Sequence, residues 1–418
     1  MRYRLLTVSA TKGPDTMAAP RLGSECLREI GSQAAIQGRS GVLRRIGAGD
    51  EPFFAFIPSP LPPDPPLQID EATEVLLDRA NRAVGRLDGV SLLLPSPDTF
   101  IYAYVRKEAV LSSQIEGTQS SLSDLLISEQ GAVPGAPAED VALVSNYVAA
   151  MNHGLARIDE GFPLSLRLIR EMHGILLIRA RGSEMDPGEF RRTQNWIGGT
   201  RPGNARFVPP PANEVLPAMG ALEKFLHDDP VATRPLLKAA LAHAQFETIH
   251  PFLDGNGRMG RLLITLLLCA EGVLKNPLLY LSVYLKRHRD QYYEHLQRIR
   301  LDGDWESWIV FFLEAVIAVA DEATATTQEI VRIIEGDRRR VAGLGRAAGT
   351  AITLHDYVSR SVVVSVPTAA RELGISDPAI YSSVRKLQEL GILVEVTGQQ
   401  RNRIFAYDKY LETLVREP

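Results

Sequence analysis

A histidine, a carboxylate and two arginines lie in one short stretch of the chain, around a pair of glycines. The stretch is His250-Pro251-Phe252-Leu253-Asp254-Gly255-Asn256-Gly257-Arg258-Met259-Gly260-Arg261. Pro251 disfavours the α conformation for the residue before it, so we expect one helix to end at His250 and another to begin after the loop. The free N–H groups of a helix start bind anions, and glycines there let a ligand approach the backbone. The spacing therefore predicts a phosphate site.

The side chains around this predicted phosphate site suit transfer of a phosphorus-containing group. Arg258 and Arg261 are three residues apart and share one helix face, and arginine is suited to two-pronged phosphate contacts. Asp254 is placed to hold Mg²⁺, because that ion usually binds through one or two carboxylates together with phosphate oxygens. His250 is the obvious proton acceptor with a near-neutral reference pKa. A general base beside an activated phosphate predicts phosphoryl or nucleotidyl transfer to a hydroxyl.

Each part of the motif has a plainer interpretation when it stands alone. A glycine pair at a helix start is a weak signal, two arginines on one face are often solvated, and a lone histidine is more often structural. Their joint occurrence in one loop is much less expected by chance. The motif is also not a P-loop, because the Lys-Ser/Thr pair of that motif is absent.

These residues resemble the signature of the Fic family of protein AMPylators, His-x-Phe-x-Asp/Glu-Gly-Asn-Gly-Arg-x-x-Arg, and every fixed position is present. The resemblance implies transfer of AMP from ATP to a Ser, Thr or Tyr hydroxyl of a protein, with the chain itself among the candidate targets. It implies that His250 is the base, that Asp254 holds Mg²⁺ and that Phe252 anchors the loop in the core. It assigns nucleotide phosphate contacts to Gly255, Asn256, Gly257, Arg258 and Arg261.

One position of the motif bears on which part of ATP is transferred. A branch of the family that uses ATP as a kinase carries Lys where this chain has Gly257. The resemblance therefore favours AMP transfer over phosphorylation.

A carboxylate with no local explanation ends a predicted helix over residues 101–116. A negative side chain in the last turn opposes the helix dipole by roughly 0.3–1 kcal/mol. Glu116 is either an exposed residue that tolerates this cost or the partner of an arginine elsewhere. Ser112, Glu116 and Gly117 also match the family's inhibitory helix, Ser/Thr-x-x-x-Glu-Gly/Asn. That match implies that Glu116 pairs with Arg261 in place of the ATP γ-phosphate, or that it orients water for AMP removal.

Most of the remaining chain has apolar residues at three- and four-residue steps, which predicts an all-α fold. The helical period breaks over residues 192–211, where we expect a small β-hairpin around a turn-rich loop. A lone hairpin is either a surface excursion or an edge that holds an extended peptide by strand addition, and the resemblance implies a flap on which the protein target docks. The proline-rich segment 58–66 is expected to be an extended connector, with an SH3-type ligand as the alternative.

Near the C-terminus the pattern predicts two helices and a β-hairpin, the order of a winged helix. Basic residues lie on the second helix (Arg385 and Lys386) and on the hairpin (Arg401 and Arg403), so the alternatives are DNA binding and an interaction or dimer module. We therefore expect a Fic helical core with a hairpin flap and a C-terminal winged-helix domain. The parts are a disordered leader (1–48), an N-terminal helical region with the inhibitory helix (49–135), the catalytic core (136–335) and the winged helix (336–418).

Composition limits the functional classes. Among 418 residues the formal net charge is -4, which gives no case for bulk nucleic-acid binding. The two cysteines, Cys26 and Cys269, have no metal-ligand or disulfide pattern, so we expect a reducing cytoplasm. No apolar run is long enough to predict a membrane span. The competing hypotheses are an AMP transferase, a de-AMPylase or bifunctional enzyme that uses Glu116, and a nucleotide-sensing DNA-binding regulator. A complete motif with His250 argues against a sensor, because sensing needs no base.

Overall fold

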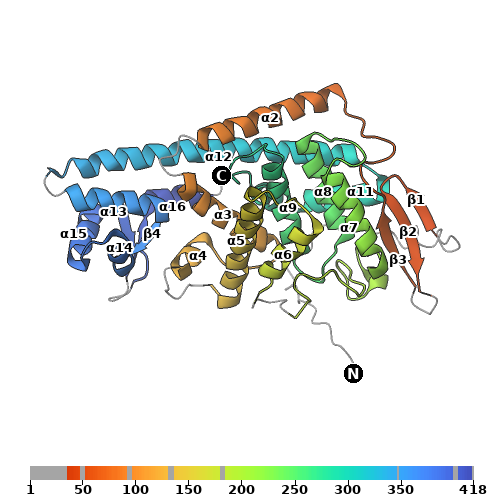
Figure 1. The fold of residues 1–418 in the computed structure, drawn as a ribbon, viewed down its shortest axis with the longest axis horizontal. Helices are drawn as coiled ribbons and strands as arrows, with labels where there is room; N and C mark the ends of the chain where they lie inside the picture. The colour runs from red at the N-terminus through yellow and green to blue at the C-terminus, as the bar shows by residue number, and fades with distance from the viewer. Residues whose placement is uncertain are drawn as a thin grey trace.

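The computed structural model describes residues 35–47, 52–91, 97–129, 136–178, 184–345, 348–398 and 403–416. The leader up to residue 34, most of the predicted 131–137 linker and Arg401 lie outside this part of the chain. Helices form the body of the molecule, and the strands form two small antiparallel sheets at its ends (Figure 1). This confirms the predicted helical fold class.

The catalytic motif lies between two helices that are buried on every side. The helices of the body are α2 (Glu71–Ser91), α3 (Pro97–Ile115), α4 (Leu122–Glu129), α5 (Ala138–Asp159), α6 (Leu166–Leu176), α7 (Ala212–Leu226), α8 (Pro235–Ile249), α9 (Asn256–Ala270), α10 (Ser282–Arg287) and α11 (Arg289–Asp302). Residues 236–249 of α8 and 258–268 of α9 are all buried, and they include the charged residues Lys238, Glu247, Arg258 and Arg261. These two helices pack on each other, and α3, α5 and α6 pack on α9. The 250–255 loop that joins them is therefore fixed at both ends by the core.

One long helix, α12 (Trp305–Ala342), runs along the body, with α2 packed against it (Figure 1). Trp308 anchors α12 to the centre, because its indole N–H donates to the Ala240 carbonyl oxygen of α8 at 2.9 Å. The helix continues to Ala342, past residue 335, where we placed the end of the predicted core. The extension is stabilised by C-terminal contacts, since the buried Asp337 accepts hydrogen bonds from Arg340 and from the Tyr407 hydroxyl.

The first sheet corrects the prediction of a disordered leader through residue 48. Strands β1 (Ala35–Gly38), β2 (Gly41–Ile46) and β3 (Phe53–Pro58) pair in that order, so the segment 35–46 is ordered. Arg39, at the turn between β1 and β2, ties the sheet to the body. Its guanidinium pairs with Glu306 of α12 at 2.8 Å and donates to the carbonyl oxygens of Pro65 and Pro66. Sequence reasoning missed these strands because their partner is the aromatic segment that follows them.

The C-terminal elements follow the predicted order of two helices and a hairpin, preceded by a further helix and strand. They are α13 (Ala348–Ser361), β4 (Val363–Ser365), α14 (Val366–Leu373), α15 (Asp377–Glu389), β5 (Leu393–Glu395), β6 (Ile404–Tyr407) and α16 (Asp408–Val415). The sheet is antiparallel with the order β4-β6-β5. Helices α13 and α16 contact both α12 and α3, so these elements rest on the helix that precedes Glu116. The domain boundaries and the winged-helix interpretation stay predictions.

Candidate active site

The loop between α8 and α9 closes on itself through side-chain contacts. His250 ends α8 as predicted, in the left-handed conformation with φ +50°, and Gly255 begins α9 with φ +76°. The Asn256 side chain accepts from the Phe252 N–H at 2.9 Å and donates to the Phe252 carbonyl oxygen at 2.8 Å. Phe252 is fully buried and stacks on the His173 ring at 3.6 Å between centroids. The predicted anchoring by Phe252 is thus present, while Asn256, expected on phosphate, here braces the loop.

Two residues that sequence reasoning missed hold the loop from outside. Arg191 is buried, donating from Nε to the His250 carbonyl oxygen at 2.9 Å and from Nη2 to the Pro210 carbonyl oxygen at 2.6 Å. His173 hydrogen-bonds the Asp254 carbonyl oxygen at 3.0 Å through Nε2, and it accepts from the Gly188 N–H through Nδ1. Burial lowers the pKa of His173 to about 4, so the neutral ring donates from Nε2. Neither residue lies in a motif, so no local signal could have identified them.

His250 is placed as a neutral base. Its Nδ1 atom is buried and has no hydrogen-bond partner within the described part of the chain. Burial, followed by the positive charges of Arg300 and Arg191, lowers the pKa of His250 to about 3. The ring therefore carries no proton on one nitrogen at neutral pH and can accept one from a neighbouring hydroxyl.

The predicted partner of Glu116 is present. The Glu116 carboxylate accepts from Nη2 of the buried Arg261 at 2.7 Å, although the two residues are 145 positions apart. Ser112 completes the contact, because its Oγ accepts from Arg261 Nε at 2.8 Å and its carbonyl oxygen from Nη2 at 2.9 Å. Burial alone would raise the pKa of Glu116, but the charges of Arg261 and Arg258 hold it below its ordinary value. Glu116 is thus an ionised carboxylate at the start of α9.

Arg258 has hydrogen-bond donors that no described residue accepts. Its Nε and Nη1 atoms are buried without a hydrogen-bond partner among the residues described, and its Nη2 lies 3.5 Å from the Asp254 carboxylate. A buried donor without an acceptor costs about 1–3 kcal/mol, so an incoming anion would remove a penalty as well as add contacts. The site accordingly suits a phosphate group.

Asp254 also suits the predicted role of Mg²⁺ ligand. Its side chain is 46 % exposed, and no cluster of three or more candidate ligands occurs among the described residues. A single accessible carboxylate beside a phosphate site suits an ion bound mainly by phosphate oxygens, and it does not suit a site built by protein alone.

Gly257 is required by the close approach of Glu116. A Cβ atom at this position would lie 2.2 Å from the Glu116 Oε1 atom and 3.1 Å from Arg261 Nη1. The absence of a side chain lets a negative group reach the positive end of α9, where a helix start stabilises it. A γ-phosphate could take the same place.

The predicted hairpin flap over residues 192–211 is a chain reversal closed by one antiparallel bridge, Ile197 to Phe207. The tip is a short 3₁₀ turn, and Asn204 Oδ1 accepts from the Thr200 and Arg201 N–H groups. The Val208 carbonyl oxygen accepts from the Phe56 N–H of β3 at 2.9 Å. The local polar contacts of the tip explain why the strand pairing is shorter than a full hairpin.

The loop and its surroundings match the sequence models of one family. Residues 75–156 match the model described as Fic/DOC family N-terminal, and residues 163–268 match that of the Fic/DOC family. Over residues 75–268 the chain belongs to the Fic/DOC family. The N-terminal match contains Glu116, and the second match contains the whole 250–261 motif.

Known Fic proteins resemble this chain over part of their length. The protein called Protein adenylyltransferase Fic from Culex quinquefasciatus is 28 % identical over 261 residues, 58 % of this chain and 47 % of the relative. The protein of the same name from Drosophila grimshawi is 30 % identical over 214 residues, 50 % of this chain and 40 % of the relative. This chain thus spans half or less of the length of these relatives.

One solved structure shows the Fic fold over a larger share of the chain. The crystal structure of a Fic family protein from Desulfovibrio desulfuricans G20 has a TM-score of 0.53 and 20 % identity, covering 82 % of this chain and 97 % of that one. At that identity the likeness concerns the fold alone.

We expect Gly257→Ala to disrupt the Glu116–Arg261 contact, because the added methyl group would collide with the carboxylate. The melting temperature should fall by several degrees, corresponding to about 1–3 kcal/mol. Most of this loss should disappear in the Glu116→Gly background, which removes the nearest atom. Gly220→Ala is the matched control, because its methyl group would meet nothing within 4 Å. An equal loss in both backgrounds would contradict the assignment.

We expect His250 to stay unprotonated between about pH 5 and pH 9, because burial and neighbouring arginines lower its pKa. The ¹⁵N chemical shifts of its imidazole, assigned by their loss in His250→Ala, measure this directly. A protonation step between about pH 6 and pH 8 would show that the arginines do not act on the ring as described.

Proposed function

We propose that this Fic chain transfers AMP from ATP to a hydroxyl group of a protein, and that Glu116 inhibits the transfer. The observation that carries the proposal is the Glu116 carboxylate bound to buried Arg261 at the start of α9. An anion already occupies the place where the resemblance puts a nucleotide phosphate. The names of the relatives support adenylyl transfer as the reaction.

In this proposal the phosphates lie along the start of α9. The N–H groups of the Gly255–Gly257 turn face the α-phosphate region, and Arg258 and Arg261 bind the distal phosphates. Mg²⁺ held at Asp254 neutralises phosphate charge when it is bound. Asn256 contributes mainly by keeping the loop in shape, since its side chain is already bonded to the Phe252 backbone.

His250 takes the proton of the target hydroxyl as its oxygen attacks the α-phosphorus. The bond between that oxygen and phosphorus forms, the bond from phosphorus to pyrophosphate breaks, and pyrophosphate leaves. Burial, and after it the positive charges of Arg300 and Arg191, lowers the pKa of His250. A bound polyphosphate would offset that charge, raise the pKa of the imidazole and make it a stronger base. The base is thus activated by the nucleotide itself.

Inhibition follows from competition for Arg261. With Glu116 bound there, the γ-phosphate has no place at this arginine, and ATP can bind only with its α-phosphate displaced from in-line attack. A misplacement of about 1 Å can cost roughly a hundredfold in rate. The protein target docks on the 192–211 flap in this account, and the chain itself is one candidate target.

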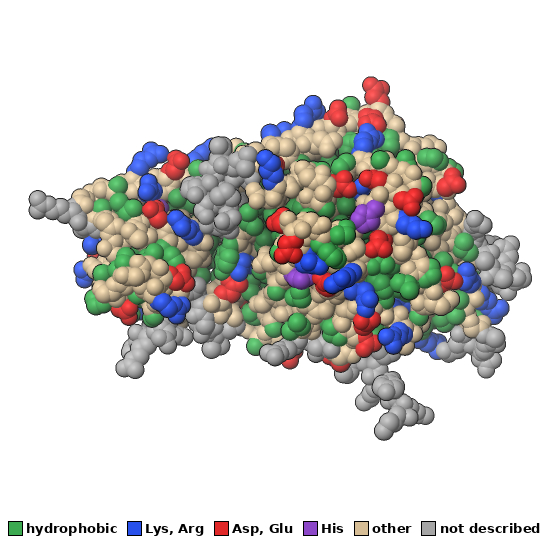
Figure 2. Space-filling view, viewed as in Figure 1, with side chains coloured by type: hydrophobic (Ala, Val, Ile, Leu, Met, Phe, Trp, Pro, Cys, Tyr) green, Lys and Arg blue, Asp and Glu red, His purple; other side chains and the backbone are tan. Residues whose placement is uncertain are grey.

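Two alternative functions are considered, one at the same site and one that also involves the C-terminal elements. The negative charge of Glu116 acts on His250 and raises its pKa, so the two groups belong to one site, which supports a de-AMPylase or bifunctional enzyme as the alternative. A nucleotide-sensing DNA-binding regulator has weaker support. Arg385 on α15 lies near Glu389 at 3.7 Å, and basic and acidic side chains are interspersed on the face shown in Figure 2.

Labelled ATP tests the proposal. Purified wild type, Glu116→Gly and Glu116→Gly/His250→Ala are incubated with Mg²⁺ and ATP labelled at the α-phosphate, and in parallel with ATP labelled at the γ-phosphate. We expect α-label on protein to rise about a hundredfold in Glu116→Gly and to be lost in the double variant.

Glu129→Gly is the matched control, because Glu129 also ends a helix and pairs with an arginine, Arg106, but lies outside the motif. It should label like wild type. Label from the γ position would identify a kinase, and an unchanged rate in Glu116→Gly would exclude the inhibitory role.

A further inference from the structure

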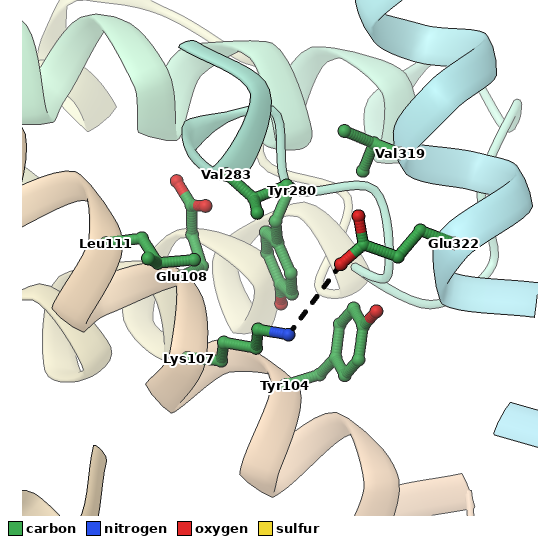
Figure 3. Close-up of a pocket in the computed structure, with 8 residues that line it drawn as sticks. All are labelled: Tyr104, Lys107, Glu108, Leu111, Tyr280, Val283, Val319 and Glu322. Atoms are coloured by element: carbon green, nitrogen blue, oxygen red, sulfur yellow. Dashed lines mark ion pairs between the residues drawn. The ribbon is translucent and has the colours of Figure 1, made fainter. Parts of the chain in front are cut away.

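A buried acid lies behind the Glu116–Arg261 contact and is not used by the reaction above. Glu108 is on α3, eight residues before Glu116, and is 2 % exposed. It lines a cavity of about 10 Å³ together with Tyr280, Lys107 and Glu322 (Figure 3). Lys107 is 3.9 Å from Glu322 of α12, so the nearby positive charge has another acidic partner. The acid therefore needs another explanation.

Hydrogen bonds at both ends, and a contact between Ser112 and Tyr147, connect this acid to Arg261. Arg261 Nε donates to Ser112 Oγ at 2.8 Å, and the Ser112 hydroxyl acts on Tyr147, whose pKa it lowers against the larger rise caused by burial. The Tyr147 hydroxyl donates to Glu108 Oε1 at 3.0 Å, and Ser282 of α10 donates to the same oxygen. All four residues beyond Arg261 are buried. The guanidinium thus donates at one end of this series, and two hydroxyl groups donate to the carboxyl group at the other.

Such a chain fixes each member through the next. A hydroxyl has one hydrogen to donate, and its direction is set by the acceptor it meets. Glu108 fixes the Tyr147 hydroxyl, Tyr147 leaves the Ser112 oxygen free to accept, and Ser112 takes Nε and Nη2 of Arg261. Bonds in series polarise one another, and an ionised group at each end strengthens all of them. The guanidinium is thereby held with one edge toward Glu116.

We propose that Glu108 is a positioning residue for Arg261, acting through Tyr147 and Ser112 to present its guanidinium to Glu116 or, when that contact opens, to the distal phosphates of the nucleotide. The phosphate half of this statement rests on the proposed function, whereas the Arg261 half does not. The role differs from catalysis, because Glu108 touches neither the nucleotide site nor the target hydroxyl.

The charge of Glu108 gives the proposal a pH signature. Burial raises its pKa to about 7, while Ser282, Arg261 and Tyr147 oppose the rise. The other titratable groups at the cavity are Tyr104 and Lys107 on α3, Tyr280 before α10, and Glu322 on α12. As pH rises through about 7, the acid becomes a carboxylate and a stronger acceptor, so the chain should hold Arg261 more firmly.

The side-chain Nε–H resonance of Arg261 tests this without nucleotide. In protein labelled with ¹⁵N at arginine side chains, the resonance is assigned by its loss in Arg261→Lys. We expect it to shift with pH in wild type with a midpoint near 7, following Glu108. Most of the shift should be lost in Glu108→Gln, which keeps an acceptor but cannot ionise.

Glu247→Gln is the matched control. Glu247 is also buried, its pKa is also raised to about 7 by burial, and the charge of Arg261 also acts on it, but it makes no hydrogen bond to Ser112 or Tyr147 within the described part of the chain. Because the charge of Glu247 also acts on Arg261, this change should reduce the shift but leave most of it. A shift that Glu108→Gln reduces no more than Glu247→Gln does would overturn the proposal.

A second readout concerns the nucleotide. In the Glu116→Gly background, Glu108→Leu should weaken ATP binding by about three- to tenfold in calorimetry, the worth of one hydrogen bond. Tyr147→Phe should have a similar effect, and the two changes together should do little more than either alone, because they break the same chain. Losses of ATP affinity that add in the double variant would contradict a shared role of Glu108 and Tyr147. If Glu116→Gly transfers no α-label, the proposed function fails while the Arg261 resonance still decides the role of Glu108.

Discussion

The buried guanidinium of Arg261 is the constraint on which the site depends. A positive charge removed from water must meet hydrogen-bond acceptors, and three of them come from the end of α3 and the residue that follows it, far from Arg261 in sequence. Ser112 supplies two acceptors inside the protein, and Glu116 supplies the third at the mouth of the loop. The packing of α3 on α9 therefore sets both the shape of the phosphate site and its occupation by a carboxylate.

The loop itself is rigid for a different reason. Its backbone carbonyls are held by Arg191 and His173, its ends by α8 and α9, and its centre by Phe252 and Asn256. A site that must place a phosphorus atom in line with an attacking oxygen tolerates little play, and this loop has almost none. Glu116 lies outside this braced loop, because it follows the last residue of α3 and precedes a glycine with φ +99°. The braced loop and the proposed inhibitory carboxylate thus belong to separate elements that meet at Arg261.

Sequence reasoning located what is local and missed what is distant. The proline after His250, the glycines and the spaced arginines determine a helix end, a turn and a helix start, so the loop could be predicted from its own residues. Glu116 was identifiable because a negative charge at a helix end is locally unfavourable. Arg191 and Tyr147 had no such mark, since their roles come from packing between helices. For the same reason the full length of α12 was missed, because the C-terminal elements stabilise its end. The β1–β2 strands pair locally and were missed because the leader was assigned to disorder.

The central claim is that Glu116 and the γ-phosphate of ATP compete for Arg261. A crystal structure of Glu116→Gly with ATP and Mg²⁺, beside one of the wild type grown under the same conditions, tests this most directly. The account predicts a γ-phosphate oxygen bound to Arg261 Nη2 in the variant, where Glu116 Oε1 lies at 2.7 Å in this structure, and a displaced α-phosphate in the wild type. A γ-phosphate bound away from Arg261, or the same nucleotide position in both proteins, would contradict it.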